Sequence, residues 1–331
     1  MEGSLLLGWL HAAAGDVELG RGTVAATIEA LPATYDEQDR ARADFALAYV
    51  LSQAGEFDAS LRALERSRPV LASSGDTWGE GANRVLTAHV ALAAGDPAGA
   101  ARSCAEAARL LADVGDPWFL VHTEAMLGAI AQAEHRFDDA CDHLGRAADS
   151  SHGQGFASSE AYHRANLGRA QQQAGHLDAA AATLERALDL ARAAGDLRVA
   201  ALARLRLGRV LRAQGDLGEA LACVRAAQGW YRASGGGDHA RLADCLVASM
   251  DPESSDAMTM LEAVLDDARR SGDPEVQVLA LDALALRSAS TGNLAGARAL
   301  LEVADAAMPQ ARVRVTDDDR ADAIAARRLL G

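Results

Sequence analysis

The sequence predicts an all-α fold, a right-handed α-solenoid of about eight helix-turn-helix repeats with a C-terminal capping helix. Two observations carry this prediction. Glycine recurs at a spacing of 40 residues along most of the chain, and between the glycines apolar residues recur at helical spacing. A fixed period of this length is typical of stacked repeats, in which each unit buries its apolar face against its neighbours. The expected turn positions are Gly15, Gly55, Gly95, His135, Gly175, Gly215, a degenerate position near Ser255, and Gly292.

Each repeat is expected to contain two antiparallel helices of about 16–18 residues. The stretch from Leu197 to Gly235 illustrates the unit, because its two apolar patterns are separated by the short turn Gly215-Asp216. Glycine ends a helix by adopting the left-handed conformation without a Cβ clash. The aspartate after it can accept a hydrogen bond from the free N–H groups of the next helix. The repeated Gly-Asp pairs therefore predict short turns.

A second set of small residues predicts close helix–helix contact. Gly or Ala occupies one position of each first helix, and another small residue usually follows twelve positions later in the second helix. Without a bulky side chain, the two backbones of a repeat can approach each other closely. The positions in the first helices are Gly8, Ala48, Ala88, Gly128, Gly168, Gly208 and Ala248.

The two ends of the chain lead to different expectations. The segment from Leu5 to Leu10 is already in phase with later first helices, so we expect something to stack on this end. That neighbour is either a preceding part of a longer chain or a second copy bound by self-association. At the other end, three aspartates at 317–319 and the pair Arg327-Arg328 complement a helix dipole. We therefore expect one solenoid domain over 1–316 and a capping helix over 317–331.

Composition excludes several classes of function. The chain has 331 residues, a net charge of −15 and no lysine, because all 32 basic residues are arginine. A lysine-dependent phosphate-binding loop and Schiff-base chemistry are therefore excluded. The acidic balance argues against direct nucleic-acid binding, and no run of residues is apolar and long enough for a membrane span. The four cysteines and nine histidines show no metal-ligand spacing, so we expect no metal, no cofactor and a reducing, cytoplasmic setting.

The segment LGRAQQQAGHLDAAAATLERA, from Leu167 to Ala187, resembles the tetratricopeptide repeat. It has Leu-Gly, then Gly seven residues on, an apolar residue two later, and small residues three and ten positions after that. The usual tetratricopeptide period is 34 residues, and HEAT-type repeats also have periods near 40. The spacing of small residues favours the tetratricopeptide family. The resemblance implies that the first helix of each pair lines a concave face.

On that implied face, the register selects one candidate site in repeats four to six. From Leu197 to Gly215 there are five arginines and no glutamate, and Asp196 and Asp216 flank the helical run. Arginine forks suit carboxylates and phosphates, so we predict an anion or acidic-peptide site. The alternative is that these arginines are solvated and pair with Glu185, Asp189 or Glu219 on neighbouring helices. The predicted site residues are His122, Tyr162, Asn166, Arg169, Gln172, Arg206, Arg209 and Arg212.

Nearly the whole chain also resembles the helical-repeat region of large actinobacterial transcriptional regulators of the SARP and MalT-like classes. The resemblance rests on Ala- and Arg-rich units such as GDLRVAALARLRLGRVLRAQGDLGEAL. It implies a non-catalytic sensor or interaction module that binds a protein, a peptide or a small anionic ligand. Two alternatives stay open: a free-standing scaffold that joins protein partners, and an enzyme or biosynthetic accessory protein built on the same repeats. No catalytic residue can be assigned from spacing.

Overall fold

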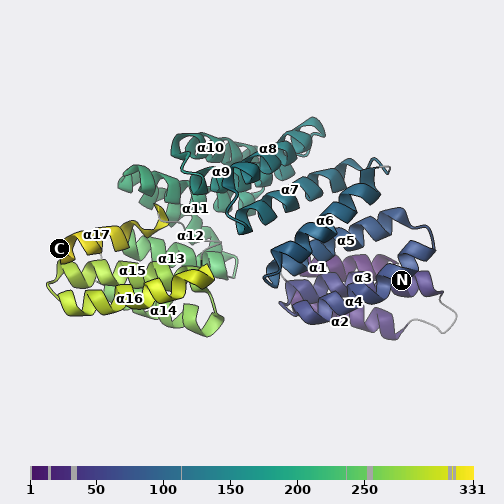
Figure 1. Cartoon of the computed structure of the whole chain (residues 1–331), viewed down its shortest axis with the longest axis horizontal. Helices are drawn as coiled ribbons and strands as arrows, with labels where there is room; N and C mark the ends of the chain where they lie inside the picture. The colour runs from purple at the N-terminus through teal and green to yellow at the C-terminus, as the bar shows by residue number, and fades with distance from the viewer. Residues whose placement is uncertain are drawn as a thin grey trace. The chain divides into compact units, whose positions relative to one another are not determined.

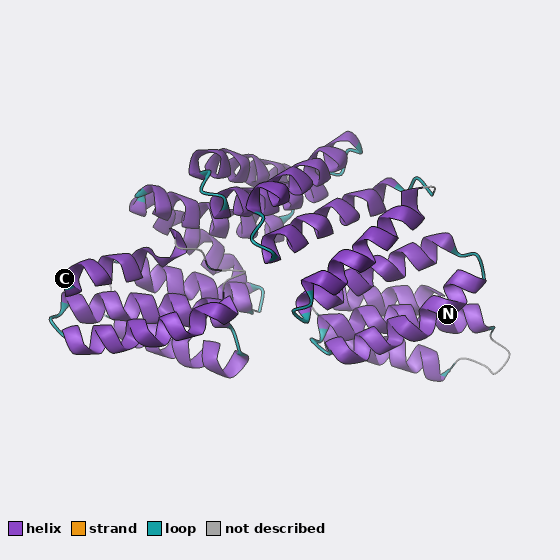
Figure 2. Ribbon diagram, viewed as in Figure 1, coloured by secondary structure: helices purple, strands orange, loops and turns teal. Residues whose placement is uncertain are grey.

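The computed structural model describes residues 2–13, 16–30, 36–112, 114–235, 237–251, 256–311, 315 and 318–331. Within these ranges the regular structure is helical, with no strand, which confirms the predicted all-α class (Figure 2). The chain divides into two compact units, residues 1–134 and 135–331, and each is described by itself.

The N-terminal unit consists of helices packed as successive antiparallel pairs (Figure 1). The first helix of each pair also contacts the first helix of the next pair, as a stacked repeat requires. Its helices are α1 (Glu2–Ala13), α2 (Val17–Glu29), α3 (Glu37–Gln53), α4 (Phe57–Ser73), α5 (Thr77–Ala93), α6 (Pro97–Ala112) and α7 (Pro117–Ala133).

The C-terminal unit continues the same pairing and contains the largest apolar core, which runs from α9 to α16. Its helices are α8 (Phe137–Gly153), α9 (Ala157–Gln173), α10 (Leu177–Ala193), α11 (Leu197–Gln214), α12 (Leu217–Ala233), α13 (Asp238–Met250), α14 (Ala257–Ser271), α15 (Pro274–Ser290), α16 (Leu294–Ala311), the 3₁₀ turn η1 (Asp318–Arg320) and α17 (Ala321–Leu330).

The turn residues adopt the backbone conformation that the glycine spacing predicts. Gly55, Gly95, Gly175 and Gly215 all have a positive φ, between 75° and 94°. His135 fills the position where a glycine is missing, and its φ of 59° is the single positive value among the described non-glycine residues. The expected turns at Gly15 and Ser255 lie outside the described residues.

Aspartate caps some of the helices, as expected, but not all of them. The side chains of Asp76, Asp196 and Asp273 each accept a hydrogen bond from a backbone N–H three residues on. Asp216 makes no such bond at the start of α12, so the prediction is wrong at that turn. There the first-turn N–H groups lie at an exposed helix end, where water can satisfy them.

The small residues bring paired helices into close backbone contact. A Cβ built on Gly208 would lie 2.5 Å from a methyl carbon of Val224 and 3.0 Å from the carbonyl oxygen of Ala220, twelve residues on. At the equivalent place in an earlier repeat, the Ser60 hydroxyl donates a 2.6 Å hydrogen bond to the carbonyl oxygen of Ala48. Both pairs confirm the twelve-residue relation between the two helices of a repeat.

The C-terminal segment, residues 318–331 with η1 and α17, packs on the last helix pair, α15 and α16. Helix α17 lies beside α15, and Figure 1 draws the two next to each other near the C-terminus. Its residues Ala323 and Ala326 are fully buried and join an apolar cluster with Ala285 and Leu301. The division into one solenoid domain over 1–316 and a capping helix over 317–331 stays a prediction.

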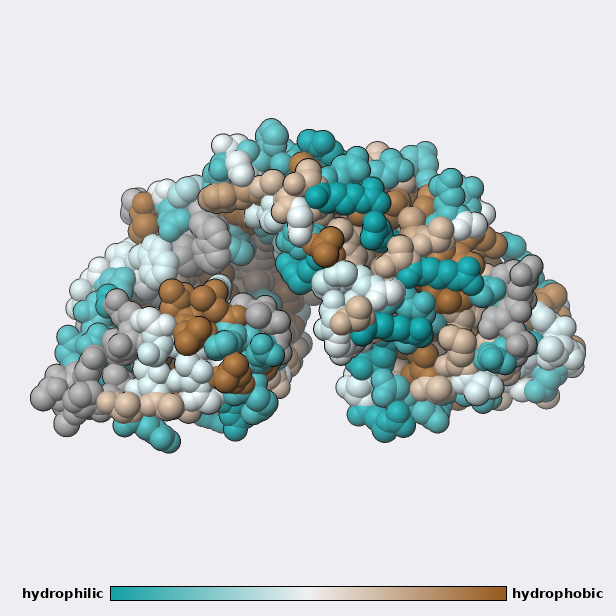
Figure 3. Space-filling view, turned by 180° about the vertical axis from the view of Figure 1, so that it is seen from behind, coloured by the Kyte–Doolittle hydropathy of each residue, from teal (hydrophilic) through white to brown (hydrophobic). Residues whose placement is uncertain are grey.

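Several large apolar side chains of the first helix pair are exposed. The residues Leu6, Leu7 and Leu10 of α1 are 57%, 49% and 49% exposed. Figure 3 shows that one face of the molecule carries brown apolar patches among teal polar residues. Self-association through this end stays a prediction. Among the described residues, no helix is both long enough and apolar enough to cross a bilayer.

Candidate binding site

Seven of the eight predicted site residues lie on two neighbouring helices of the C-terminal unit. Helix α9 carries Tyr162, Asn166, Arg169 and Gln172, and α11 carries Arg206, Arg209 and Arg212. Within each helix these residues are three or four positions apart, which places them on one face. Because α9 contacts α11, the two faces meet. We call Asn166, Arg169, Gln172, Arg206, Arg209 and Arg212 the arginine cluster.

Arg209 lies at the centre of the arginine cluster and is paired with two carboxylates. Its Nη1 is 2.6 Å from Oε1 of Glu275, and its Nη2 is 2.8 Å from Oδ1 of Asp319. The three side chains are only 4%, 9% and 5% exposed. Burial disfavours the charged guanidinium, but the charges and hydrogen bonds of Asp319 and Glu275 outweigh it and raise the pKa of Arg209. This is a buried ion triad rather than a solvated arginine.

Three other residues of the arginine cluster also contact acidic side chains. Arg169 and Gln172 contact the two carboxylates of the triad, and Arg212 binds a third carboxylate, that of Asp322. Arg169 Nη1 lies 4.0 Å from the Glu275 oxygen that Arg209 binds, and the Gln172 amide donates a 3.0 Å hydrogen bond to Asp319. Arg212 Nη2 lies 2.5 Å from Oδ1 of Asp322, where both side chains are about 10% exposed. Glu275 lies in the first turn of α15, Asp319 lies in η1 and Asp322 lies in α17.

Arg206 differs from the other arginines of the cluster because its described partner is neutral. Its Nη1 donates a 2.8 Å hydrogen bond to the side-chain oxygen of Asn166, and no carboxylate of the described residues pairs with it. Burial, followed by the positive charge of Arg169, lowers the pKa of Arg206 to about 10. It is still charged near neutral pH, so this side of the cluster carries uncompensated positive charge.

Aromatic side chains border the Arg206 side of the cluster. Tyr162 is 38% exposed, and the guanidinium of Arg198 lies 5.7 Å from its ring centroid, in the range of a cation–π contact. Burial raises the pKa of Tyr231 to about 12, although the nearby charges of Arg206 and Arg198 oppose that shift. The Tyr231 phenol therefore stays neutral near pH 7 and can donate a hydrogen bond.

The alternative prediction, that the arginines pair with Glu185, Asp189 or Glu219, is wrong for Arg209 and Arg212. Those three acids lie on second helices, α10 and α12, whereas the acids that bind the cluster come from α15 and the C-terminal segment. Periodicity assigns residues to faces within one repeat, and it carries no information on which distant segment crosses that face.

His122 lies on α7 of the N-terminal unit, whereas the arginine cluster consists of residues of α9 and α11 in the C-terminal unit. Burial lowers its pKa to about 4, so the ring is neutral at physiological pH. A neutral imidazole cannot supply the positive charge that the predicted anion site needs. Its assignment as a binding residue stays a prediction.

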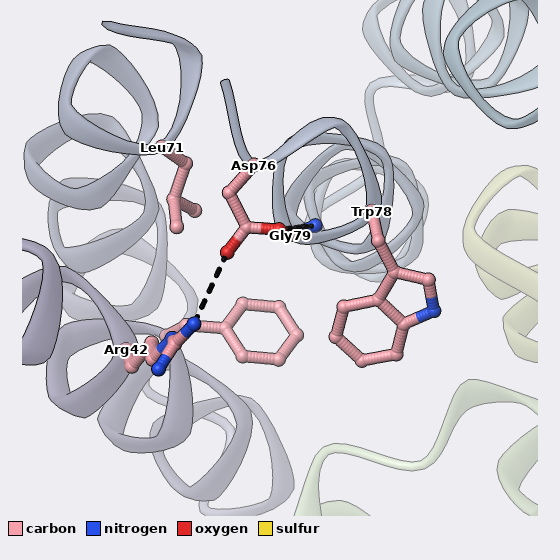
Figure 4. A pocket seen from close by; sticks show the side chains of 6 residues that line it. Arg42, Leu71, Asp76, Trp78 and Gly79 are labelled. Atoms are coloured by element: carbon pink, nitrogen blue, oxygen red, sulfur yellow. Dashed lines mark hydrogen bonds and ion pairs between the residues drawn. The ribbon is translucent and has the colours of Figure 1, made fainter. Parts of the chain in front are cut away.

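A separate cavity of about 310 Å³ lies in the N-terminal unit, where sequence reasoning placed no site. Asp76 at the start of α5 is 3.7 Å from Arg42 of α3 and accepts a 2.8 Å hydrogen bond from the Gly79 N–H. Figure 4 shows the Trp78 indole on the opposite side of Asp76 from Leu71. The indole N–H donates a 3.0 Å hydrogen bond to Asp116, which precedes α7. Trp78 therefore links two repeats, and the cavity sits beside that link.

The described residues include four free cysteines but no cluster of metal-ligating side chains. No group of three or more His, Cys, Asp or Glu side chains among them is arranged to hold a metal ion. The four cysteines are free, and burial raises the pKa of Cys104 to about 11, as it does for Cys141. Such thiols are protonated near pH 7 and are poor nucleophiles.

Comparisons with known proteins support the repeat assignment. The tetratricopeptide repeat family model matches residues 164–193, which include Arg169, Gln172 and the turn at Gly175. No curated protein sequence gives a significant match.

The similarity to solved structures concerns the fold. Aspartyl phosphate phosphatase F from Bacillus subtilis is 9% identical, with 95% of each chain covered and a TM-score of 0.70. The Rap conjugation gene regulator of the plasmid pLS20, in complex with the Phr* peptide, is 13% identical, with a TM-score of 0.58 over 92% of this chain and 99% of that one. A Pyrococcus horikoshii signal transduction ATPase with a tetratricopeptide repeat sensor is 14% identical, with a TM-score of 0.63 over 80% of this chain. This chain spans only 42% of that protein.

Proposed function

We propose that the C-terminal unit is a non-catalytic binding module that recognises an acidic peptide segment through the arginine cluster. The observation that carries the proposal is Arg206, a charged guanidinium beside Arg169 and Arg209 whose described hydrogen-bond partner is a neutral amide. A carboxylate placed there would gain charge-assisted hydrogen bonds and relieve repulsion between the arginines. Exposed Tyr162 at the border offers an aromatic surface for the rest of the peptide.

We propose further that this binding serves regulation, as the sensor part of a transcriptional regulator in the cytoplasm. The support is the fold shared with a gene regulator that was solved with a peptide and with an ATPase described as having a repeat sensor. The free cysteines agree with a reducing compartment. A scaffold that joins two proteins would use the same face without a regulatory output.

The test is binding of a fluorescein-labelled hexa-aspartate peptide, followed by fluorescence anisotropy at low salt. Arg206→Gln removes the uncompensated charge and should weaken binding about tenfold or more, because a hydrogen bond to a charged group contributes roughly 1.5–3 kcal/mol. Arg204→Gln is the matched control, since it makes the same charge change on α11. The charge of Arg204 acts on a different neighbour, because it opposes the raised pKa of Cys223 of α12. Equal affinity of the two variants would rule out the proposed site.

Inorganic phosphate distinguishes the small-anion alternative. If phosphate at millimolar concentration displaces the peptide completely and Tyr162→Ala has no effect, the ligand is a small anion rather than a peptide. The proposal expects partial displacement, together with weaker peptide binding by Tyr162→Ala.

A further inference from the structure

The C-terminal segment already places acidic groups in the arginine cluster. Asp319 binds Arg209 and Gln172, and Asp322 binds Arg212. These three partners are predicted site residues, and they are separated from the segment by about a hundred residues or more of sequence. Two carboxylates three positions apart, held by arginine forks, present the chemistry that an acidic peptide would present.

The same segment is held in place by a second set of contacts that does not involve the cluster. The Arg320 guanidinium binds Asp282 of α15 at 2.6 Å and Asp305 of α16 at 2.6 Å, and Arg327 also binds Asp305. Ala323 and Ala326 add buried apolar contact. The basic and apolar groups of the segment therefore attach it to the last helix pair, whereas its acids reach the cluster.

Because the two sets of contacts use different side chains, Asp319 and Asp322 can exchange partners while the basic and apolar groups of the segment keep it attached to α15 and α16. Removing a partner from a buried charge is costly, but replacing one carboxylate by another leaves the charge around Arg209 and Arg212 unchanged. Glu275, the other carboxylate that binds Arg209, belongs to α15 and not to this segment. A ligand with several adjacent carboxylates could start at Arg206 and continue to Arg209 and Arg212.

We propose that the segment containing Asp319 and Asp322 is an intramolecular competitor that occupies part of the peptide site and sets the affinity threshold for an acidic ligand. The proposal rests on the proposed function, since the competitor needs a site to compete for. A tethered group acts at a high effective concentration, so a ligand with one carboxylate is excluded. A peptide with several neighbouring carboxylates engages Arg206 as well and displaces the acids of the segment.

The experiment compares the wild-type chain with Asp319→Asn/Asp322→Asn in the full-length protein, using the labelled hexa-aspartate peptide. We expect the variant to bind roughly tenfold tighter or better, because the competing charges are gone while the side-chain shapes are kept. The control Glu262→Gln/Glu302→Gln removes two exposed carboxylates from α14 and α16 and should leave affinity within about twofold of wild type.

Hydrogen exchange on the unmutated chain gives an independent measurement that does not depend on how the variant folds. Saturating hexa-aspartate should speed exchange at the start of α17, around residues 321–324, because displacement of Asp319 and Asp322 loosens that turn. Unchanged or slower exchange there, or equal affinity of the acid variant and wild type, would overturn the competitor.

The outcomes separate the two proposals. If Arg206→Gln weakens binding but the acid variant binds like wild type, the competitor is refuted and the binding site stands. If neither wild type nor the acid variant binds the peptide, both are refuted. Binding by the acid variant with little binding by wild type supports both.

Discussion

Burial, rather than distance, should decide the energetic effect of the ion pairs in the C-terminal unit, and Arg209 provides the test. Its pair with Glu275 has an N···O distance of 2.6 Å, the same as the pair between Arg225 and Asp251. The side chains of the first pair are 4% and 9% exposed, and those of the second are 52% and 19% exposed. The two pairs therefore differ mainly in solvation.

Arg209→Met leaves two buried carboxylates without their main cation. Breaking a buried pair from one side costs about 3–5 kcal/mol. Arg169 still lies 4.0 Å from Glu275 and Gln172 still donates to Asp319, so the cost should fall at the low end, about 3 kcal/mol. Arg225→Met removes an exposed pair and should cost at most about 1 kcal/mol.

Urea unfolding is a suitable assay because urea does not screen charges. Trp230 on α12 is the one tryptophan in the sequence of the C-terminal unit, so a background with Trp9, Trp78 and Trp118 changed to Phe reports on that unit. The free energies of unfolding of the two Met variants should differ by about 2 kcal/mol or more at pH 7. A difference below about 0.5 kcal/mol would refute the argument that the Arg209 triad is desolvated.

Two further predictions concern packing and pH. Gly208→Ala should lower the free energy of unfolding by about 1–3 kcal/mol, because its Cβ would meet the backbone oxygen of Ala220. Gly229→Ala has open space within α12 and should raise the free energy of unfolding by about 0.5–1 kcal/mol. Thermal unfolding of both variants tests this contrast, and a change of the same sign in both would contradict it. The pKa of His122 is lowered to about 4, so between that pH and 6.5 the unfolded chain binds a proton that the folded chain does not, and stability falls as the pH falls. Between pH 7 and 4.5 the free energy of unfolding of wild type should fall by about 2–3 kcal/mol more than that of His122→Gln. Urea unfolding at each pH measures this difference. If the two proteins lose stability in parallel as the pH falls, the lowered pKa of His122 is wrong.

The repeat architecture could be predicted because its causes are local. Turn glycines need a positive φ, and small residues twelve positions apart allow two adjacent helices to touch. Both requirements leave a regular mark in the sequence. At the turn position where glycine is replaced by histidine, the backbone conformation is the same. His135 adopts the left-handed conformation because the helices on either side impose it.

The arginine cluster was predictable in position but not in its partners. The register placed Arg206, Arg209 and Arg212 on one helix face, and they do share that face. The identity of the acids that reach them depends on the small rotation between successive repeats, added over several repeats, which no local pattern encodes. In the sequence, the aspartates at 317–319 indicate only a favourable interaction with a helix dipole, whereas in the structure Asp319 forms an ion pair with Arg209. The cavity beside Trp78 was missed for a similar reason, since Arg42 and Asp76 meet there from different helices.

The charge balance of the chain is compatible with the acidic ligand that we propose for this acidic protein. A net charge of −15 repels an acidic peptide at long range, but screening limits that repulsion to about 8 Å at physiological ionic strength. Inside the arginine cluster the local balance is reversed, because Arg206 adds a charge that Glu275, Asp319 and Asp322 do not compensate. An acidic ligand would therefore gain attraction only on contact with this cluster, and the acids of the C-terminal segment would set how many carboxylates it must bring. Selectivity would then follow from the number and spacing of ligand carboxylates rather than from long-range steering.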